Sequence, residues 1–509
     1  MSQILHFQTQ LRQELPKVVG NLDYHIFRDQ LERISEIIEL GQLDLKILKC
    51  LIEEAESVKQ KKSEETGAAS QPISRKEIAY MKKLASSALR CTVSRGLSGE
   101  SYRVFSAHVA DSSLLQRFCI LDNFGGVIKV PSKSTLQRYE KIVPESVVRD
   151  IVNHLSKKAS EKPTEKKDQV LNLQDAVSLD DYYADLSVVK TNIHFPVDWV
   201  LLLDAVRTLV KAIIWIRKSE IKNRMQDPKG FIKKMNRYAM QMTHTRRRKD
   251  SKKEQKRLLR LMKKVTITIR KHAERHRDLL KNNWESVGLK EGHVKQTLSR
   301  IEQVLSLLPQ AIEQAHERII GERTLKSQDK LLSLYEPDSN IIVRGKAGAE
   351  VEFGNKMFIG EQKNGLILDW YLYQGKAPSD SQAVIESLDR MKSVGCCPKQ
   401  VTGDRGLFSK KNEKILTEKK IQNNLCPRNV VQMQKALQDG EFARHQLRRG
   451  QTEGRIGIIK NCFLGTPFRN KGFSSRNQGL SWRILTHNLW VLSRLPRIGI
   501  EDIPVPLTA

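Results

Sequence analysis

Apolar residues recur with helical spacing through the first part of the chain. Within residues 1–57 they fall three and four positions apart, as at Ile34, Ile37 and Ile38, which predicts helices with one buried face. A stretch rich in Lys, Glu, Ser and Gly then occupies residues 58–74 and predicts a linker. The pattern therefore predicts an N-terminal helical region that a linker separates from the rest of the chain.

Shorter helical patterns continue over residues 75–155. They are interrupted at Asn123–Gly126 and resume where Ser132 or Ser134 is placed to cap a helix that runs through Tyr139. Two short helices joined by a glycine turn are typical of a helix-turn-helix domain that reads DNA, and they occur equally in other small helical bundles. We predict an all-helical domain here and expect it to bind DNA.

A change of pattern follows a second polar linker at residues 156–174. The run Tyr182–Thr191 is rich in β-forming residues and predicts a strand that ends before Pro196, so that residues 175–198 begin a sheet domain. From 199 to 335 the pattern is helical again. This predicts a long helical insertion within the sheet domain.

After residue 335 short strand patterns return, separated by glycine-containing turns and by helical patterns. The predicted strands lie at Asn340–Val343, Lys356–Glu361, Leu366–Tyr373, Pro398–Asp404 and Ile421–Cys426, and the predicted helices at Ser379–Met391, from Ser409, and on to Leu495. The order β, helical insertion, βββ, α, β, α, β, α, α predicts the α/β fold class, with helices flanking a mixed sheet. Residues 336–509 would complete this domain and add C-terminal helices.

The chain is strongly basic, with 88 Lys and Arg against 58 Asp and Glu and a formal net charge of +30. Such a charge repels itself unless a polyanion neutralises it, and nucleic acid is the first polyanion to consider. Residues 217–277, inside the insertion, hold 23 Lys and Arg against 5 Asp and Glu, including Arg246, Arg247, Arg248 and Lys249. Because one sign dominates instead of alternating, we expect this block to contact phosphates.

Other features of the sequence narrow the class of protein. No apolar stretch reaches the ~18 residues of a membrane span, and the N-terminus lacks the segments of a secretory signal. The seven cysteines include no C-x-x-C pair, which favours reduced thiols over a zinc site. We therefore expect a cytoplasmic protein with no membrane partner.

Three carboxylates sit where this layout would let them converge. Asp185 lies in the first strand, Asp404 at the carboxyl end of a later strand, and Glu453 on a helix after the sheet. Clustered carboxylates are the ligands that Mg²⁺ prefers, and two such ions about 3.5–4 Å apart stabilise the attacking and leaving oxygens of phosphodiester cleavage. The sequence thus predicts a magnesium site beside a DNA-binding surface. Asp181 and Asp198 remain alternatives for the first acid.

The helix that carries Glu453 offers further chemistry on one face. Arg449 precedes Glu453 by four residues and Lys460 follows it by seven. At about 100° per residue all three project from the same side, as in a stripe that binds a metal and phosphates. Glycines at positions 450, 454 and 457 flank the acid, which is understandable if a backbone or a DNA strand approaches closely.

Four segments together resemble a known family. They are Asp185–Asp198, Gly345–Lys356, Asp404–Gly406 and Arg449–Arg455, and they are similar to the DDE transposases of bacterial insertion sequences, which have an RNase H-like catalytic domain. The spacing from Arg449 to Glu453 and Lys460 matches the signature around the third catalytic acid of that group. Gln446 stands where relatives have a tyrosine, and the long insertion lies between the first two acids instead of the last two.

This resemblance implies a transposase that binds the ends of its own insertion sequence, cleaves them with Mg²⁺ or Mn²⁺, and joins the 3′-hydroxyl ends to target DNA. The implied metal ligands are Asp185, Asp404 and Glu453, and the implied DNA contacts are Arg449, Arg455 and Lys460. It also implies double-stranded DNA as the partner, a homodimer or larger oligomer on that DNA, and a place at the bacterial nucleoid. The alternatives are a metal-dependent nuclease of the same fold and an inactive DNA-binding descendant.

Overall fold

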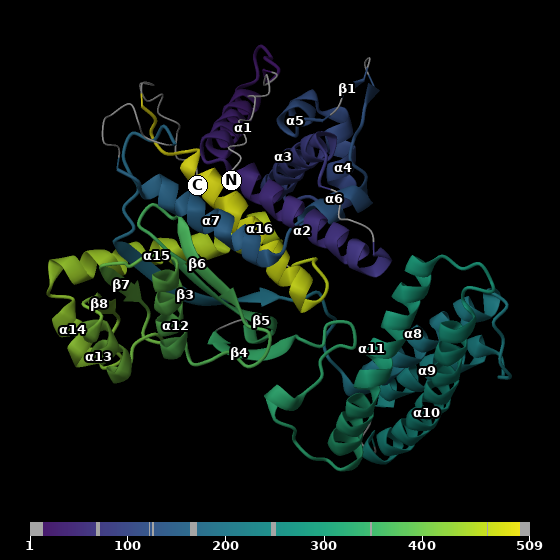
Figure 1. The fold of residues 1–509 in the computed structure, drawn as a ribbon. Coiled ribbons are helices and arrows are strands. Elements are labelled where there is room, and N and C mark those ends of the chain that lie inside the picture. The colour runs from purple at the N-terminus through teal and green to yellow at the C-terminus, as the bar shows by residue number, and fades with distance from the viewer. Residues whose placement is uncertain are drawn as a thin grey trace.

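The chain forms a mixed α/β structure that is mainly helical and has a small mixed sheet at its centre, in agreement with the predicted α/β class. The computed structural model describes residues 14–67, 72–121, 123–124, 127–162, 171–245, 251–346, 349–465 and 467–498. Figure 1 shows the N-terminal helices above the sheet and a helical bundle at its side. Within the described residues no helix combines the length and the apolar character needed to cross a membrane.

Helices and one short hairpin make up the N-terminal part of the described chain. They are α1 (Leu22–Leu40), α2 (Leu43–Thr66), α3 (Arg75–Ser98), α4 (Tyr102–Asp111), α5 (Ser113–Phe118), β1 (Asn123–Phe124), β2 (Val127–Ile128), α6 (Lys133–Glu140) and α7 (Glu145–Ser160). Ser132 caps α6 by accepting a hydrogen bond from the backbone N–H of Thr135, which confirms the predicted start of that helix. The sequence pattern predicted an all-helical region. The pairing of β1 with β2 shows that this prediction was wrong.

Both predicted linkers are shorter than the sequence pattern indicates. The helix α2 continues through Thr66, because residues 58–66 are mostly good helix formers such as Lys, Gln and Glu. The helix α7 likewise continues to Ser160. Residues 68–71 and 163–170 lie outside the described residues.

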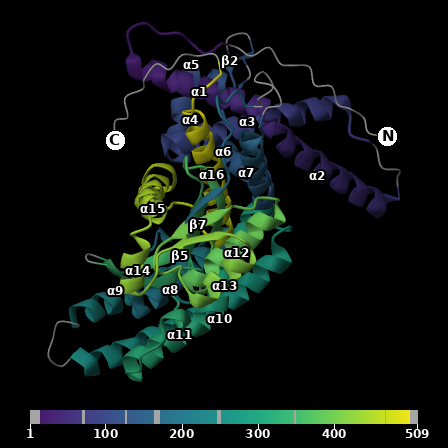
Figure 2. The ribbon, with the colours of Figure 1, turned by 90° about the vertical axis from the view of Figure 1, so that its left-hand side faces the viewer.

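The N-terminal helices share one core with the sheet. Their apolar faces pack together with the sheet and with α16 (Phe473–Leu492), and Figure 2 shows α16 beside α6 and α7. Trp482 of α16 is fully buried and donates its indole N–H to the backbone carbonyl of Glu140 over 2.8 Å. Residues 75–155 are therefore part of the same body as the sheet, and not an independent domain.

The central sheet of the described chain follows the predicted order of elements. Its strands are β3 (Asp181–Lys190), β4 (Asn340–Lys346), β5 (Ala349–Glu361), β6 (Ile367–Leu372), β7 (Gln400–Gly403) and β8 (Gln422–Leu425). They are arranged as β4-β5-β3-β7-β8, with β6 also paired to β5. β5 is antiparallel to β3, whereas β3, β7 and β8 are parallel. The helices α12 (Asp380–Ser393) and α13 (Lys410–Glu418) provide the crossovers that parallel strands require.

Helices cover both faces of the sheet, and alternate residues of β3 point to opposite layers. The hydroxyl of Tyr183 is hydrogen-bonded to Nδ1 of His445 over 2.9 Å, so α15 (Gly440–Ile458) covers the face of the odd-numbered residues. Tyr182 is hydrogen-bonded instead to Ser387 of α12. The short helix α14 (Val430–Ala436) precedes α15, and the π-helical turn η3 (Ile459–Leu464) follows it. Asp185 therefore faces α15.

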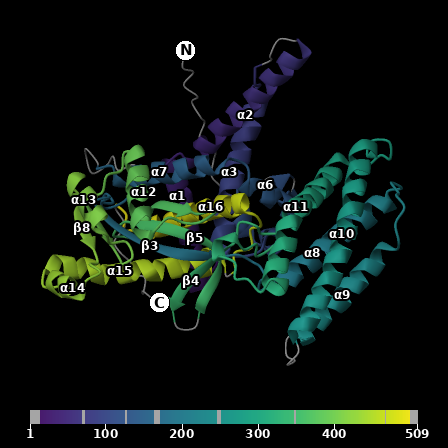
Figure 3. The same cartoon turned by 90° about the horizontal axis from the view of Figure 1, so that it is seen from below.

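The predicted insertion is a helical bundle. It consists of α8 (Asp198–Lys218), α9 (Pro228–Thr245), α10 (Ser251–Asn283) and α11 (Glu291–Ala315), followed by the turns η1 (His316–Ile320) and η2 (Ser327–Asp329). Apolar stripes that include Leu209, Met262 and Leu308 form a core separate from that of the sheet. Figure 3 shows the bundle beside the sheet.

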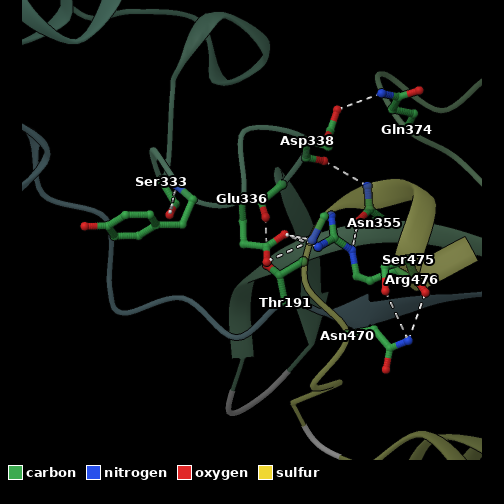
Figure 4. Close-up of polar contacts among 12 residues, drawn as sticks. Thr191, Ser333, Glu336, Asp338, Asn355, Gln374, Asn470, Ser475 and Arg476 are labelled. Atoms are coloured by element: carbon green, nitrogen blue, oxygen red, sulfur yellow. Dashed lines mark hydrogen bonds and ion pairs between the residues drawn. The ribbon is translucent and has the colours of Figure 1, made fainter. Parts of the chain in front are cut away.

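The bundle leaves and rejoins the sheet at one clamp, drawn in Figure 4. The chain exits after Thr191 and returns through Glu336 and Ser339, and Ser339 Oγ donates a hydrogen bond to Thr191 Oγ1 over 2.8 Å. Glu336 pairs with the buried guanidinium of Arg476 on α16. Arg476 Nε also donates to Asn355 of β5 over 3.1 Å. The clamp thus fastens both ends of the insertion to the sheet and to α16.

Candidate active site

The register of the sheet places Asp185 and Asp404 next to each other. β3 and β7 are parallel, and Ala184 pairs with Gly403 at the end of β7. The next residue along each strand is an aspartate, and neighbouring strands lie about 4.8 Å apart. Asp404, which follows the short strand β7, therefore lies beside Asp185 in the middle of the longer strand β3.

A tight turn after β7 holds the carboxylate of Asp404. Its Oδ1 accepts hydrogen bonds from the backbone N–H groups of Gly406 over 3.0 Å and Leu407 over 3.2 Å. A Cβ at residue 406 would lie 3.0 Å from Asp380 Oδ2 and 3.2 Å from Asp404 Oδ1, so only glycine fits without a shift of these groups. A further acid, Asp380 at the start of α12, therefore lies close to Asp404. Nothing in the sequence pattern shows that α12 begins beside β7.

The helix α15 supplies the third acid. Glu453 pairs with Arg449 on the preceding turn, with 2.8 Å between Oε1 and Nη1. Lys460 lies in η3, and its Nζ donates a hydrogen bond to Ser187 Oγ of β3 over 3.3 Å. The predicted stripe of one acid and two cations is present, and Lys460 reaches the strand that carries Asp185.

These side chains line one cavity of about 540 Å³. Its charged residues are the acids Asp185, Asp380, Asp404 and Glu453 and the bases Lys356 and Lys460. Lys356 of β5 forms an ion pair with Asp380. The sequence pattern did not single out this pair, because the position of β5 relative to α12 emerges only when the sheet is assembled. The cavity combines several carboxylates with cations that can bind phosphate.

The surroundings of Asp185 disfavour its charged form. Its pKa is raised from the ordinary 3.8 to about 6, first by burial and then by the negative charges of Asp404 and Glu453. The backbone N–H of Leu186 and the charge of Arg449 act in the opposite direction on this pKa. A divalent cation between the three carboxylates would offset their repulsion.

The donors of the cavity suit a hard divalent cation, because they are carboxylate oxygens. Among the residues that the structure describes, no group of three or more His, Cys, Asp or Glu side chains is arranged to hold a metal ion. Glu453 is turned toward Arg449, and Asp380 toward Lys356. The acids are thus gathered around one cavity without forming a closed set of ligands.

A buried glutamate holds α15 against the sheet. Glu361 of β5 is fully buried and accepts a hydrogen bond from the hydroxyl of Thr452 over 2.7 Å. It also pairs with Arg448 at 3.1 Å and with Arg455 at 2.9 Å. Arg455 thus forms an internal ion pair, and the DNA contact that we expected for it stays a prediction. The sequence holds no signal for Glu361, because its partners on α15 lie far along the chain.

The two alternatives for the first acid lie elsewhere. Asp198 begins α8 and pairs with Arg318 in the bundle at 2.7 Å. Asp181, at the start of β3, accepts a hydrogen bond from Gln400 of β7. Neither residue lines the carboxylate cavity. The geometry therefore favours Asp185 as the first acid of the cluster.

Other residues singled out from the sequence have different surroundings. Gln446 donates a hydrogen bond to the backbone carbonyl of Asn424 over 2.7 Å and so ties α15 to β8. An added Cβ at Gly450, Gly454 or Gly457 would meet no atom within 4 Å, so no protein backbone approaches them. The basic run Arg246, Arg247, Arg248 and Lys249 lies outside the described residues.

Comparison of the chain with known proteins finds no match. No protein-family model, no curated protein and no solved structure resembles it significantly. The function must therefore be inferred from the geometry and charge of the site and from the motifs of the chain.

Proposed function

We propose that the protein is a DDE transposase, which cleaves DNA at the ends of its element and joins the freed 3′-hydroxyl ends to target DNA. The observation that carries this proposal is the convergence of Asp185, Asp404 and Glu453 on one cavity, although a whole helical bundle separates the first two in sequence. Gathering like charges is unfavourable unless a cation neutralises them. A phosphodiester reaction that uses two metal ions needs such a cluster of carboxylates to hold the ions.

The strand order supports an RNase H-like catalytic domain. β3, β5 and β6 form an antiparallel meander, and β7 and β8 extend the other side of β3 in parallel. Asp185 lies on the central strand of this sheet, and Asp404 directly follows the strand beside it. β4 adds a further strand that pairs with β5.

Each charged group of the cavity then has a role. Asp185, Asp404 and Glu453 would hold Mg²⁺, or Mn²⁺ in its place, and such an ion would supply the activation of an oxygen nucleophile, a water or a 3′-hydroxyl. Lys356 and Lys460 flank the acids and would bind oxygens of the scissile phosphate. The helix α15 keeps its acid in place through the buried contacts of Glu361 described above. Arg449, which pairs with Glu453 on the same helix, would bind a neighbouring phosphate.

The helical bundle supports contact with flanking or target DNA. Its helices α9 and α10 expose cations that form no ion pair with any carboxylate in the described part of the chain. These are Lys233, Lys234, Arg237, Arg260, Lys264 and Lys271. Such cations are free to release counterions from a DNA backbone. The N-terminal helices would recognise the terminal sequence, and the protein would act on paired ends at the nucleoid as a homodimer or larger oligomer.

The test is incubation of the purified protein with a supercoiled plasmid that carries the ends of its element, with and without Mg²⁺. We expect metal-dependent cleavage at the ends that Asp404→Asn and Glu453→Gln each abolish, because each removes a metal-binding charge. Glu441→Gln, an exposed acid at the start of the same helix, is the matched control and should cleave normally. Cleavage that survives in both active-site variants would refute the proposal.

The same reaction separates a transposase from a nuclease of the same fold. A transposase converts cleaved ends into molecules joined to target DNA, whereas a nuclease stops at free ends. Joined products that require Glu453 are expected. Cleavage without joined products would assign the site to a nuclease, and binding without cleavage in the wild type would assign the protein to the inactive descendants of this group.

A further inference from the structure

A second cavity, of about 840 Å³, lies where the N-terminal helices meet the C-terminal part of the chain. Its walls come from α3, α4 and α6 on one side and from η3, α16 and the segment between them on the other. The cavity adjoins the carboxylate site along the chain: Asn461 of η3 lines the first cavity and Phe463 of the same turn lines the second.

A buried guanidinium with two nitrogens that have no hydrogen-bond partner among the described residues lines this second cavity. Arg483 of α16 is only 3% exposed, and its Nε and Nη1 are buried without a hydrogen-bond partner. A buried cationic group without partners is strongly unfavourable, so such a group calls for an explanation. The burial and the charge of nearby Arg95 lower the pKa of Arg483 to about 10. Arg483 therefore remains a cation, which the charge of Glu140 favours without a hydrogen bond to it.

Two acids, Glu100 and Glu140, line this cavity, and the buried one already has a partner. Glu140 of α6 is buried and pairs with Arg95 at 2.8 Å between Oε2 and Nη2. The same oxygen accepts a hydrogen bond from the hydroxyl of Tyr102, and Oε1 accepts one from Asn470, which also bonds Ser475 in Figure 4. One carboxylate thus faces two buried guanidiniums and is hydrogen-bonded to only one of them, so one positive charge of this group stays unbalanced.

The rim of the cavity is also basic. Five exposed cations surround it, and none forms an ion pair with a carboxylate among the described residues. They are Lys133, Arg138, Lys141, Arg469 and Lys471. A site with a buried guanidinium and with cations around the rim has the charge pattern of a phosphate site, because planar guanidinium groups bind phosphate oxygens in pairs.

We propose that this cavity binds backbone phosphates of the DNA strand that enters the carboxylate site, with Arg483 and Arg138 as phosphate ligands. The cavity is far larger than one phosphate ion needs, several cations line it, and η3 lines both this cavity and the carboxylate cavity, which suits a polymer better than a free anion. The assignment of DNA as the occupant rests on the proposed function, whereas the need of Arg483 for an anion does not.

The test measures binding, not cleavage, and uses the full chain with Glu453→Gln as background. A fluorescein-labelled duplex that carries the end of the element is titrated by anisotropy over a range of salt concentrations. We expect Arg138→Gln with Arg469→Gln to weaken binding on the order of tenfold, and the slope of log affinity against log salt to fall by about 0.9 for each lost contact. Arg494→Gln, an exposed arginine just beyond α16 and outside the cavity, is the matched control and should change the slope less.

Arg483→Met tests the buried ligand itself. Because this change removes an uncompensated buried charge, we expect the melting temperature to stay the same or rise while DNA binding weakens. A fall in melting temperature with unchanged DNA binding would make Arg483 a structural residue and overturn the proposal. This readout stays valid if the wild type proves unable to cleave DNA, in which case the proposed function fails and the phosphate site stands.

Inorganic phosphate separates the two sources of the anion. If the site binds DNA, inorganic phosphate should displace the labelled duplex from the wild-type protein. In the cavity variants both the DNA affinity and this effect of phosphate should be reduced. A rise of melting temperature with phosphate that disappears in Arg483→Met, while DNA binding is the same in all variants, would show a site for a free anion. That result would overturn the assignment to DNA.

Discussion

Arg476 and Glu336 form a buried ion pair at the point where the helical bundle rejoins the sheet. Glu336 also accepts a hydrogen bond from the backbone N–H of Gly472 over 3.0 Å. Removing one partner of such a pair leaves the other charge buried, which costs about 3–5 kcal/mol. We therefore predict that Glu336→Ala lowers the free energy of unfolding by about 3–5 kcal/mol in urea denaturation.

A surface ion pair provides the control for this clamp. Glu317 pairs with Arg323, whose side chain is 74% exposed. Exposed pairs contribute at most about 1 kcal/mol, so Glu317→Ala should change the free energy of unfolding by less than that. Equal losses in the two variants would show that the clamp contributes no more than an ordinary surface contact.

The second prediction concerns the glutamate that holds α15. Glu361→Ala leaves Arg448 and Arg455 largely buried without their counter-charge, so we predict a loss of about 3–5 kcal/mol in the free energy of unfolding. Because α15 also carries Glu453, cleavage by the folded fraction should fall as well. The exposed Glu441, on the first turn of α15, is the control. Normal cleavage by folded Glu361→Ala would show that the helix keeps its register without this anchor.

The third prediction follows from the raised pKa of Asp185. The folded protein binds a proton at Asp185 up to about pH 6, whereas in the unfolded chain its ordinary pKa is 3.8. The contribution of Asp185 to stability is therefore fully present below pH 3.8 and is lost as the pH rises through 6, because the folded state holds the proton more tightly. At about 1.4 kcal/mol per pKa unit, the loss is on the order of 3 kcal/mol. Asp185→Asn removes this loss.

Thermal denaturation without metal checks the sign of this effect. Asp185→Asn should melt at a higher temperature than the wild type at about pH 8 and at nearly the same temperature at about pH 4. Addition of Mg²⁺ should raise the melting temperature of the wild type more than that of the variant, because the cation binds the charged form. If Asp185→Asn is no more stable than the wild type at about pH 8, the inference that the charged form of Asp185 is unfavourable in the folded protein is wrong.

Much of the sheet could be predicted from the sequence, because its elements are local. Strand and helix patterns mark their own positions, and Asp404 stands out as an acid that ends a short strand. The face shared by Arg449, Glu453 and Lys460 was predicted from helical geometry alone; Glu453 and Lys460 line one cavity, and Arg449 pairs with Glu453. Helix propensity also explains why the linker predicted from residue 58 was wrong. The polar residues at the end of α2 resemble a linker but are good helix formers.

Features that depend on distant pairing could not be predicted in this way. Arg455 has the sequence context of a DNA contact. Only the assembled sheet shows that it forms an ion pair with Glu361 of β5. Asp380 and Lys356 enter the cavity because α12 starts beside β7 and β5 pairs with β3. The shared core of the N-terminal helices and α16 joins the two ends of the chain, and no periodicity along the sequence reports such a contact.

The last prediction compares DNA binding by exposed cations of the bundle that form no ion pair in the described chain with binding by a cation that does. Arg260 and Lys264 lie one turn apart on α10 and form no ion pair within the described chain, whereas Arg257 on the same helix pairs with Glu254 at 2.6 Å. If α10 contacts DNA, Arg260→Gln with Lys264→Gln should reduce the salt slope of DNA binding by about 0.9 for each lost contact. Arg257→Gln should reduce it less, because Glu254 already neutralises that charge. Equal slopes in all three proteins would mean that this face of the bundle stays in solvent, and DNA contact would then have to come from other surfaces.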